Sequence, residues 1–239
     1  MKIPKKISPC PIQEAIFEVR FDTAIPGDAI FGICYNEFKA DFSQVVKSPL
    51  LEIPDSIRLS DPNLIFSPHY KLVKDNFLLQ IGPRVFSVVN LKEYGGWEVF
   101  SKSILEAFEK IKKTGIISKV LRVALRYVNV FENTNIFDKS SLKLQINEEP
   151  LNFESADLTA EIVTDKCVCR TKIANNATIK IGEKAISGSL IDIDVVYKSS
   201  YENIYNELPS VIEAAHIDEK IVFFRLLLED YINSLNPEY

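Results

Sequence analysis

Hydrophobic and polar residues alternate near the start of the chain. Between Gln13 and Asp22, apolar residues take nearly every second position, and charged residues take most of the positions between them. A period of two over this length is typical of a β-strand with one buried face. We therefore predict a strand whose buried side holds Ala15, Phe17, Val19 and Phe21, and whose other side holds Glu14, Glu18, Arg20 and Asp22, with Ile16 as the exception.

The spacing becomes helical after Pro26-Gly27. Apolar residues then recur every three or four positions, and Asp28 is a suitable residue to cap the beginning of a helix. Beyond this helix, residues 47–63 contain three prolines and are predicted to form an irregular connection. The apolar positions of the predicted helix are Ile30, Cys34, Phe38, Phe42 and Val45.

Three strands and a helix are predicted next. The strands cover residues 64–74, 77–81 and 85–91, with turns at Asp75-Asn76 and Gly82-Pro83. An apolar stripe from Trp97 to Ile111 then predicts a helix, which Gly115 should end. Lys110, Lys112 and Lys113 would lie at its carboxyl end, where positive charge complements the helix dipole.

The second half of the chain shows a similar order of patterns. A strand is predicted at 120–131, a short helix within 136–146, and one long strand at 158–173. Turn residues Asn175-Asn176 precede strands at 178–181 and 190–197, which are joined by a loop containing Gly182 and Gly188. A helix capped by Ser199 or Ser200 should start near Tyr201, break or bend at Pro209, and be followed by a final helix at 218–235.

These patterns predict an α+β protein with antiparallel sheets and packed helices. The order of elements suggests that a β-α-β-β-β-α unit occurs twice, in residues 1–116 and 117–239, within one compact domain. Adding 106 to the residue number aligns Val19-Arg20-Phe21 with Leu125-Arg126-Tyr127, and Arg84–Asn90 with Leu190–Val196. We therefore predict an internal duplication.

Strand alternation also predicts a charged sheet face. Val123, Leu125 and Tyr127 should point to the core, as should Ile191, Ile193, Val195 and Tyr197, so the residues between them point the other way. If the three strands share a sheet, this face could bind phosphate or carboxylate through arginines and a metal or basic ligand through aspartates. The alternative is a solvated face with cross-strand ion pairs, which are routine in antiparallel sheets. The candidate ligand-binding residues are Glu18, Arg20, Arg122, Arg126, Asp192 and Asp194.

Charge and hydropathy argue against two classes of function. The formal net charge of −5 disfavours binding to nucleic acid, whose phosphates repel an acidic protein. No apolar stretch approaches the roughly 20 residues of a membrane span. The charged start, Met1 to Lys6, is not followed by an apolar run, so we predict no secretory signal and a cytoplasmic location.

Cysteine and histidine do not form a recognisable catalytic or metal motif. The four cysteines include no C-x-x-C pair, so we predict no metal site, and reduced thiols suit the cytoplasm. Cys167 and Cys169 should share the buried face of a strand. Nothing in the sequence places His69 or His216 beside a nucleophile, and each is predicted to be a surface or capping residue. No phosphate-binding glycine loop occurs, and no cofactor is predicted.

The final predicted helix is apolar on nearly every side. Such a helix is either buried between the two halves or covers a partner, so a protein partner or a homodimer formed through the C-terminal helices is one prediction. The residues concerned are Ile221, Val222, Phe223, Phe224, Leu226, Leu227 and Leu228.

Three segments together resemble a known family. They are Pro11 to Phe21, Tyr94-Gly95-Gly96-Trp97, and Leu125-Arg126-Tyr127-Val128-Asn129. Together they are similar to a family of uncharacterised, sporadically distributed bacterial and archaeal proteins of about this length. The resemblance covers nearly the whole chain, carries no catalytic residue, and implies the patchy distribution of genes from mobile elements or defence loci.

Two hypotheses about function follow, and the sequence does not decide whether the protein is an enzyme. The first is a non-catalytic binding, interaction or regulatory protein, with a defence-associated role as one form of it, because no catalytic constellation is present. The alternative is an enzyme or sensor that acts on a phosphorylated small molecule through the charged sheet face.

Overall fold

The structure is a computed structural model that describes residues 2–91, 93–150, 155–181, 184–198 and 200–239. Within these residues, nine strands form one antiparallel sheet in the order β2-β3-β4-β5-β1-β6-β11-β10-β9, and β7 (Gln145–Ile146) pairs separately with β8 (Glu149–Pro150). The strands of the large sheet are β2 (Gln44–Lys47), β3 (Tyr70–Lys74), β4 (Phe77–Gly82), β5 (Val85–Leu91), β1 (Ile12–Asp22), β6 (Lys119–Glu132), β11 (Lys184–Tyr197), β10 (Cys167–Ile181) and β9 (Asp157–Val163).

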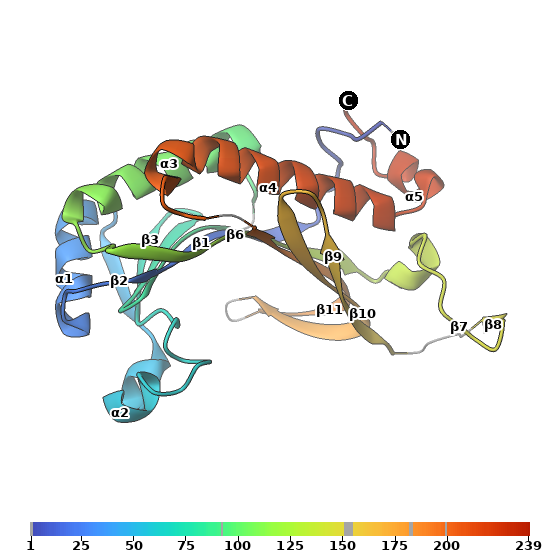
Figure 1. Cartoon of the computed structure of the whole chain (residues 1–239). Helices are drawn as coiled ribbons and strands as arrows, with labels where there is room; N and C mark the ends of the chain where they lie inside the picture. Colours follow the sequence, from blue (N-terminus) through green and yellow to red (C-terminus); the bar gives the residue numbers. More distant parts are fainter. Residues whose placement is uncertain (1, 92, 151–154, 182–183, 199) are drawn as a thin grey trace.

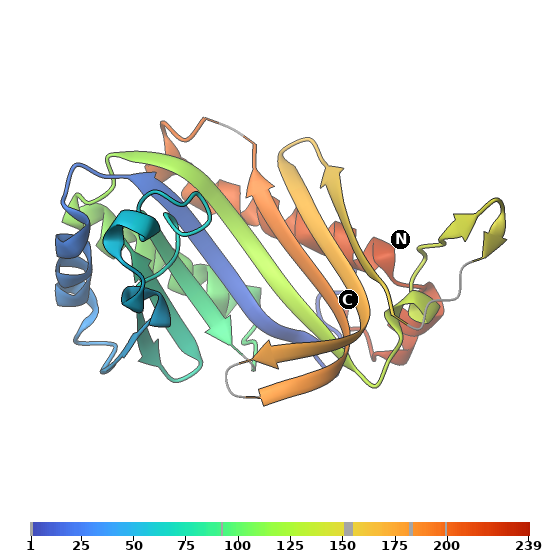
Figure 2. The same ribbon diagram turned by 90° about the horizontal axis from the view of Figure 1, so that it is seen from below.

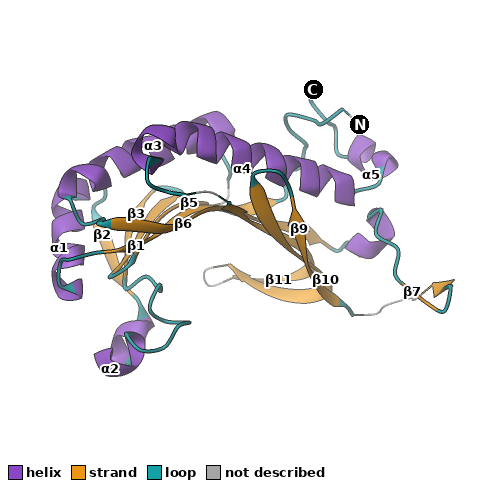
Figure 3. Cartoon of the chain, viewed as in Figure 1, coloured by secondary structure: helices purple, strands orange, loops and turns teal. Residues whose placement is uncertain are grey.

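The long helices cover one face of this sheet, which we call the helix face (Figures 1 and 3). They are α1 (Gly27–Phe38), α3 (Trp97–Thr114) and α4 (Ile204–Leu226), and the short α5 (Glu229–Ser234) follows α4. The short helix α2 (Asp55–Arg58) lies below the opposite face, which we call the polar face, and the far part of the β10–β11 hairpin turns beneath the same face. Two 3-10 helices complete the fold: η1 (Pro49–Glu52) and η2 (Ile136–Lys139). In the described part of the chain, no helix is long and apolar enough to cross a bilayer.

The core lies between the helix face and the helices. Every second residue of β1 is buried, as the alternation predicted, and Phe17 packs edge-to-face against Phe108 of α3 with ring centroids 6.3 Å apart. Tyr127 of β6 is fully buried in the same layer. The predicted α+β class, an antiparallel sheet with packed helices, is confirmed.

The helix from Trp97 is the element that the sequence predicted best. Its buried side chains form the expected stripe, from Phe100 to Ile111. Gly115 ends it in the left-handed conformation, with φ of 69°, which glycine adopts at little cost because it has no Cβ.

The region after β1 differs from the prediction at three points. Asp28 does not cap α1; it lies in the first turn, after the N-cap Pro26. Val45 belongs to strand β2, because the helix ends at Phe38 and the chain then joins the edge of the sheet. The connection at 47–63 contains η1 and α2, and the predicted strand at 64–74 begins only at Tyr70.

The predicted strand at 158–173 is a hairpin. Strands β9 and β10 are joined by a turn in which the Thr164 hydroxyl accepts a hydrogen bond from the Cys167 amide at 2.9 Å. Asn175 and Asn176 form no chain reversal; they lie within β10, at an irregularity between Ala174 and Ala177 that bends the hairpin. Gly188 lies within β11, and the predicted loop residue Gly182 falls outside the described residues.

The two predicted C-terminal helices are mainly one. Helix α4 runs without a break through Pro209, because a proline removes only one backbone donor while Leu208, Val211 and Ile212 stay buried. The side chain of Ser200 does not cap α4, whose N-cap is Asn203, and Ser199 lies outside the described residues. The helix predicted at 218–235 is therefore the end of α4 followed by α5.

Both predicted halves contribute to the same sheet, and they meet at β1 and β6. There Glu18 lies opposite Ala124, but an antiparallel pair of strands contains such a residue pair for any even shift, so this pairing does not test the shift of 106. Farther out, Ser87 of β5 lies opposite Glu18 while Val196 of β11 lies opposite Ala124, which corresponds to a shift of 109. The alignment of Arg84–Asn90 with Leu190–Val196 is therefore wrong, because an odd difference of three exchanges the two faces of a strand. Internal duplication, and the division at residue 116, remain predictions.

Candidate functional site

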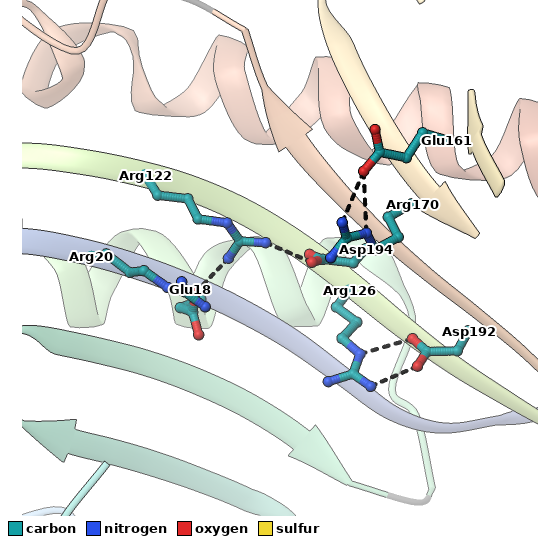
Figure 4. A network of polar contacts seen from close by, with 8 residues as sticks. All are labelled: Glu18, Arg20, Arg122, Arg126, Glu161, Arg170, Asp192 and Asp194. Atoms are coloured by element: carbon teal, nitrogen blue, oxygen red, sulfur yellow. Dashed lines mark hydrogen bonds and ion pairs between the residues drawn. The ribbon is translucent and has the colours of Figure 1, made fainter. Parts of the chain in front are cut away.

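The six candidate residues lie together on the polar face, on three adjacent strands. Glu18 and Arg20 come from β1, Arg122 and Arg126 from β6, and Asp192 and Asp194 from β11 (Figure 4). Each lies between residues that point to the core, so the alternation of the three strands brings them to one surface. The structure places the residues together as predicted, whereas a ligand-binding role remains a prediction.

Arg122 connects β1 to β11. Its guanidinium donates a hydrogen bond to Glu18 on one side and to Asp194 on the other, where Nη2 lies 2.6 Å from Oδ2. Arg20 donates to the same Glu18 carboxylate at 2.7 Å. Only 18% of the Arg122 side chain is exposed, so these pairs are partly shielded from solvent.

Arg126 and Asp192 form the best-aligned ion pair of the face. The guanidinium donates through Nε and Nη2 to the two carboxylate oxygens, at 2.8 and 2.6 Å. Such bidentate pairs are the strongest arginine–carboxylate contacts. The hydrogen bond to Asp192 is the main reason that the pKa of Arg126 is raised above its usual value.

Glu14 lies next to this pair on the same face. Its carboxylate makes no ion pair or hydrogen bond with the described residues, although Arg126 and Lys71 are near enough to favour its charged form. Burial outweighs these charges and raises the pKa of Glu14.

The charged face extends beyond the six candidates, to the edge of the sheet. Arg170 of β10 donates to Glu161 of β9 at 3.0 and 3.2 Å, and Lys172 pairs with Asp157 at 2.7 Å. The sequence contains a signal for these residues, because Arg170 and Lys172 alternate with Cys169, Thr171 and Ile173. Predicting residues 158–173 as a single strand concealed the β9–β10 hairpin and thus the pairing.

The geometry restricts what this surface can do. Both central arginines are already bonded to carboxylates, so an incoming phosphate would have to displace Asp192, Asp194 or Glu18. In the described parts of the chain, no group of three or more His, Cys, Asp or Glu residues is arranged to hold a metal ion. The face therefore forms a nearly neutral, internally paired surface.

A separate cavity lies between α1, α3 and the β3–β4 turn. It has a volume of about 390 Å³ and includes Phe38, Phe77, Asp41 and Lys110 in its walls. The last two form an ion pair with each other. The cavity is thus separate from the candidate residues, and its walls also include Lys74, Asp75 and Glu106.

The two histidines were predicted to be surface or capping residues, and the structure places both in more buried environments. His216 lies in the middle of α4, stacked on Trp97 with ring centroids 4.1 Å apart and hydrogen-bonded to Tyr127 Oη at 3.2 Å. Burial lowers the pKa of His216 to about 3. The half-buried His69 lies within hydrogen-bonding distance of Arg58, and burial followed by this positive charge lowers its pKa.

A buried carboxyl group on α4 was missed by the sequence analysis. Glu219 is only 6% exposed and lies one turn after His216, toward the sheet. Burial raises the pKa of Glu219 to about 8, although the nearby Lys220 acts in the opposite direction. A glutamate in a helix gives no sequence signal of burial, because the neighbours that cover it come from distant segments.

The cysteines agree with the predicted packing. Cys167 and Cys169 are both fully buried on the helix face, and Cys34 is buried in α1. Burial raises the pKa of each of these three thiols to about 12, which keeps them protonated and unreactive.

Comparison of the sequence with protein-family models and with curated proteins finds no match. The family resemblance noted above therefore remains a prediction.

Proposed function

We propose that the protein is a non-catalytic binding protein that acts as an interaction or regulatory component. The observation that supports this most is the mutual neutralisation of the polar face, where Arg122 and Arg126 are each held by carboxylates of neighbouring strands. A catalytic or phosphate-sensing site would need some of these charges free to act on a ligand.

The same pairing disfavours the alternative of an enzyme or sensor for a phosphorylated small molecule. Phosphate would compete with a bidentate carboxylate that is already in place, and Asp192 and Asp194 would repel it. Glu14, whose carboxylate has no ion-pair partner among the described residues, adds negative potential beside Arg126.

We place this function in the cytoplasm. The four cysteines are unpaired, and the buried Cys167 and Cys169 lie on the same strand face without a disulfide. A connection with defence is supported only by the family resemblance, and we include it as one form that a regulatory role could take.

A thermal-shift screen tests this proposal against its alternative. The ligands are inorganic phosphate, polyphosphate, nucleotides and divalent cations, because any ligand that binds only the folded state raises its melting temperature. We expect no ligand to raise the melting temperature by more than about 1 °C. Stabilisation by a phosphate compound that disappears in Arg126→Ala would contradict the proposal and support a phosphate site.

A further inference from the structure

We propose that the outer edge of β9 binds an extended segment of a partner protein in which basic and apolar side chains alternate. The proposal rests on the proposed function as a binding protein and names the surface and the kind of partner. Strand β9 is the last strand of the sheet, on the side opposite to β2 (Figure 2). Its free edge, its charge and its apolar side each support the proposal.

The backbone of β9 is available for another strand. The Thr164 amide bonds to the Cys167 carbonyl, and the Asn175 amide bonds to the Ala156 carbonyl. Since hydrogen-bonded pairs alternate in an antiparallel ladder, even-numbered residues of β9 bond to β10 and odd-numbered residues direct their N–H and C=O groups outward. Within the described residues, no strand pairs with this outer edge. The outward groups belong to Asp157, Thr159, Glu161 and Val163.

The opposite edge of the sheet lacks these properties. Strand β2 has four residues, compared with seven for β9, and ends at Lys47. Short edge strands and lysines are common means of preventing further strand addition. The longer β9 is therefore the better edge for a partner.

Charge on the polar face indicates what the partner would carry. In the middle of the sheet, from β6 to β9, the charged residues of each strand on this face share one sign, and the sign changes from strand to strand; Glu132, at the end of β6, lies outside this part. The residues are Arg122 and Arg126 on β6, Asp192 and Asp194 on β11, Arg170 and Lys172 on β10, and Asp157 and Glu161 on β9.

Strands β11 and β10 each lie between two strands that carry the opposite charge. Strand β9 has an oppositely charged neighbour on one side only. Asp157 and Glu161 pair with β10, and their side chains remain 58% and 55% exposed. An added strand with basic residues at every second position would continue the alternation, because directly opposed unlike charges stabilise neighbouring strands.

The helix-face side of β9 would receive the apolar residues of the partner. Leu158, Ala160 and Ile162 point to this side, and Ile162 is 38% exposed. Helix α4 packs over β6, β10 and β11, so the outermost strand is incompletely covered. Apolar side chains on an added strand would bury this strip.

A second copy of β9 would be a poor occupant of this edge. Antiparallel pairing of two β9 strands centred on Thr159 would place Asp157 of each copy directly opposite Glu161 of the other on the polar face. Like charges on adjacent strands are destabilising. The proposal therefore commits to a basic and apolar segment from another protein.

The test uses the full chain and labelled synthetic peptides of about eight residues, a common strand length. The probe alternates Lys and Val, and two further peptides serve as controls. One alternates Glu and Val; the other has the same lysines with prolines between them, which keeps the charge but prevents strand pairing. Binding is measured by fluorescence anisotropy. We expect the Lys-Val peptide to bind at least about tenfold more tightly than either control, a difference of roughly 1.4 kcal/mol.

Two pairs of protein variants locate the binding. The double variant D157K/E161K reverses the charge of β9, whereas E106K/E109K makes the same change at exposed positions of α3. Thr159→Pro removes an outward N–H group but no bond to β10, and Thr159→Val retains that group. Circular dichroism and the melting temperature verify that each variant is folded.

We expect D157K/E161K not to bind the Lys-Val peptide and to bind the Glu-Val peptide instead. Thr159→Pro should weaken binding of the Lys-Val peptide at least about tenfold. E106K/E109K and Thr159→Val should behave like the wild type. The proposal would be overturned if the three peptides bound the wild type with equal affinity. It would also be overturned if the Lys-Val peptide bound Thr159→Pro as tightly as it binds the wild type. Such a result would leave the broader binding function standing, since that is tested separately by the response to phosphate compounds.

Discussion

Arg122 lies between two carboxylates that would otherwise face each other across β6. Replacing it with alanine leaves Glu18 and Asp194 partly buried without this partner. We expect Arg122→Ala to lower the free energy of unfolding by about 1–3 kcal/mol, as measured by urea denaturation.

The matched control for this change is Arg170→Ala on the same face. Arg170 and its partner Glu161 are both more than half exposed, so the loss should be at most about 1 kcal/mol. Equal losses of unfolding free energy for the two variants would show that the burial of Arg122 does not strengthen its ion pairs.

Glu219 makes stability depend on pH. Its pKa is raised from 4.5 in the unfolded chain to about 8 in the folded protein, so the folded state binds more protons between these values and stability falls as pH rises through this window. The lowered pKa of His216 acts oppositely, but only below about 6.5. Between pH 6.5 and 8, the Glu219 effect should therefore be visible.

We expect Glu219→Gln to flatten this part of the profile and to raise stability at pH 8.5 by at least about 1 kcal/mol. Urea denaturation of both proteins from pH 6.5 to 8.5 measures the difference, and Glu213→Gln, at an exposed position of the same helix, is the control. Parallel profiles for the wild type and Glu219→Gln would show that the buried carboxyl does not titrate as described.

At the scale of single residues, the sequence predicted which face of a strand a side chain lies on better than it predicted burial and contacts. The alternation placed Arg126 and Asp192 on the polar face, because side-chain direction in a strand is fixed by the backbone. The burial of Glu219 and the stacking of His216 on Trp97 depend on contacts between segments far apart in the chain. No local pattern contains this information.

Among the elements, β6 and β11 approach too closely for a side chain at one point. A Cβ atom on Gly188 would lie 2.4 Å from the Phe131 carbonyl oxygen. We expect Gly188→Ala to destabilise the protein by at least about 2 kcal/mol in urea denaturation, because the backbone must shift.

Gly32→Ala in α1 is the matched control, since no atom lies within 4 Å of its added Cβ. It should stabilise the protein by about 0.5–1 kcal/mol, because alanine favours the helix. A neutral Gly188→Ala would indicate that β11 does not approach β6 as closely as described.

The apolar side chains at the end of α4 pack mainly against other residues of the same chain. Val222, Phe223, Phe224 and Leu227 are buried against this chain, whereas Leu228 is 42% exposed. We expect Phe224→Ala to cost about 3–5 kcal/mol at any protein concentration, and Leu228→Ala to cost much less. A loss for Phe224→Ala that grows on dilution would instead support the predicted homodimer through the C-terminal helices.

Elements with a continuous period were predicted well, and interrupted ones were not. Helix α3 has an uninterrupted apolar stripe and a glycine stop, and both were found. The β9–β10 hairpin was missed because its turn, Thr164-Asp165-Lys166, contains no glycine or proline. A break or bend at Pro209 was predicted because the helix propensity of proline is low. In the structure, α4 continues through Pro209 because the turns around it are buried.

At the scale of the whole molecule, the two parts of the chain join through β1 and β6 to form a single sheet. The sequence predicted the fold class and several elements of each part, such as β1 and α3, but not this join, since the partner of a strand is decided by long-range packing. The join makes the polar face continuous from β1 to β9. The paired charges of the face and its open acidic edge are therefore properties of the assembled sheet.

The central claim is that the charges of the polar face bind each other, and a double-mutant cycle on Arg126 and Asp192 tests it most directly. The free energy of unfolding is measured for the wild type, Arg126→Ala, Asp192→Ala and the double variant, all at the same salt concentration. We predict a coupling energy of about 1–3 kcal/mol, as expected for a bidentate pair with a mostly buried carboxylate. A coupling energy near zero would contradict the account, because the two side chains would then be independent and free to serve a ligand.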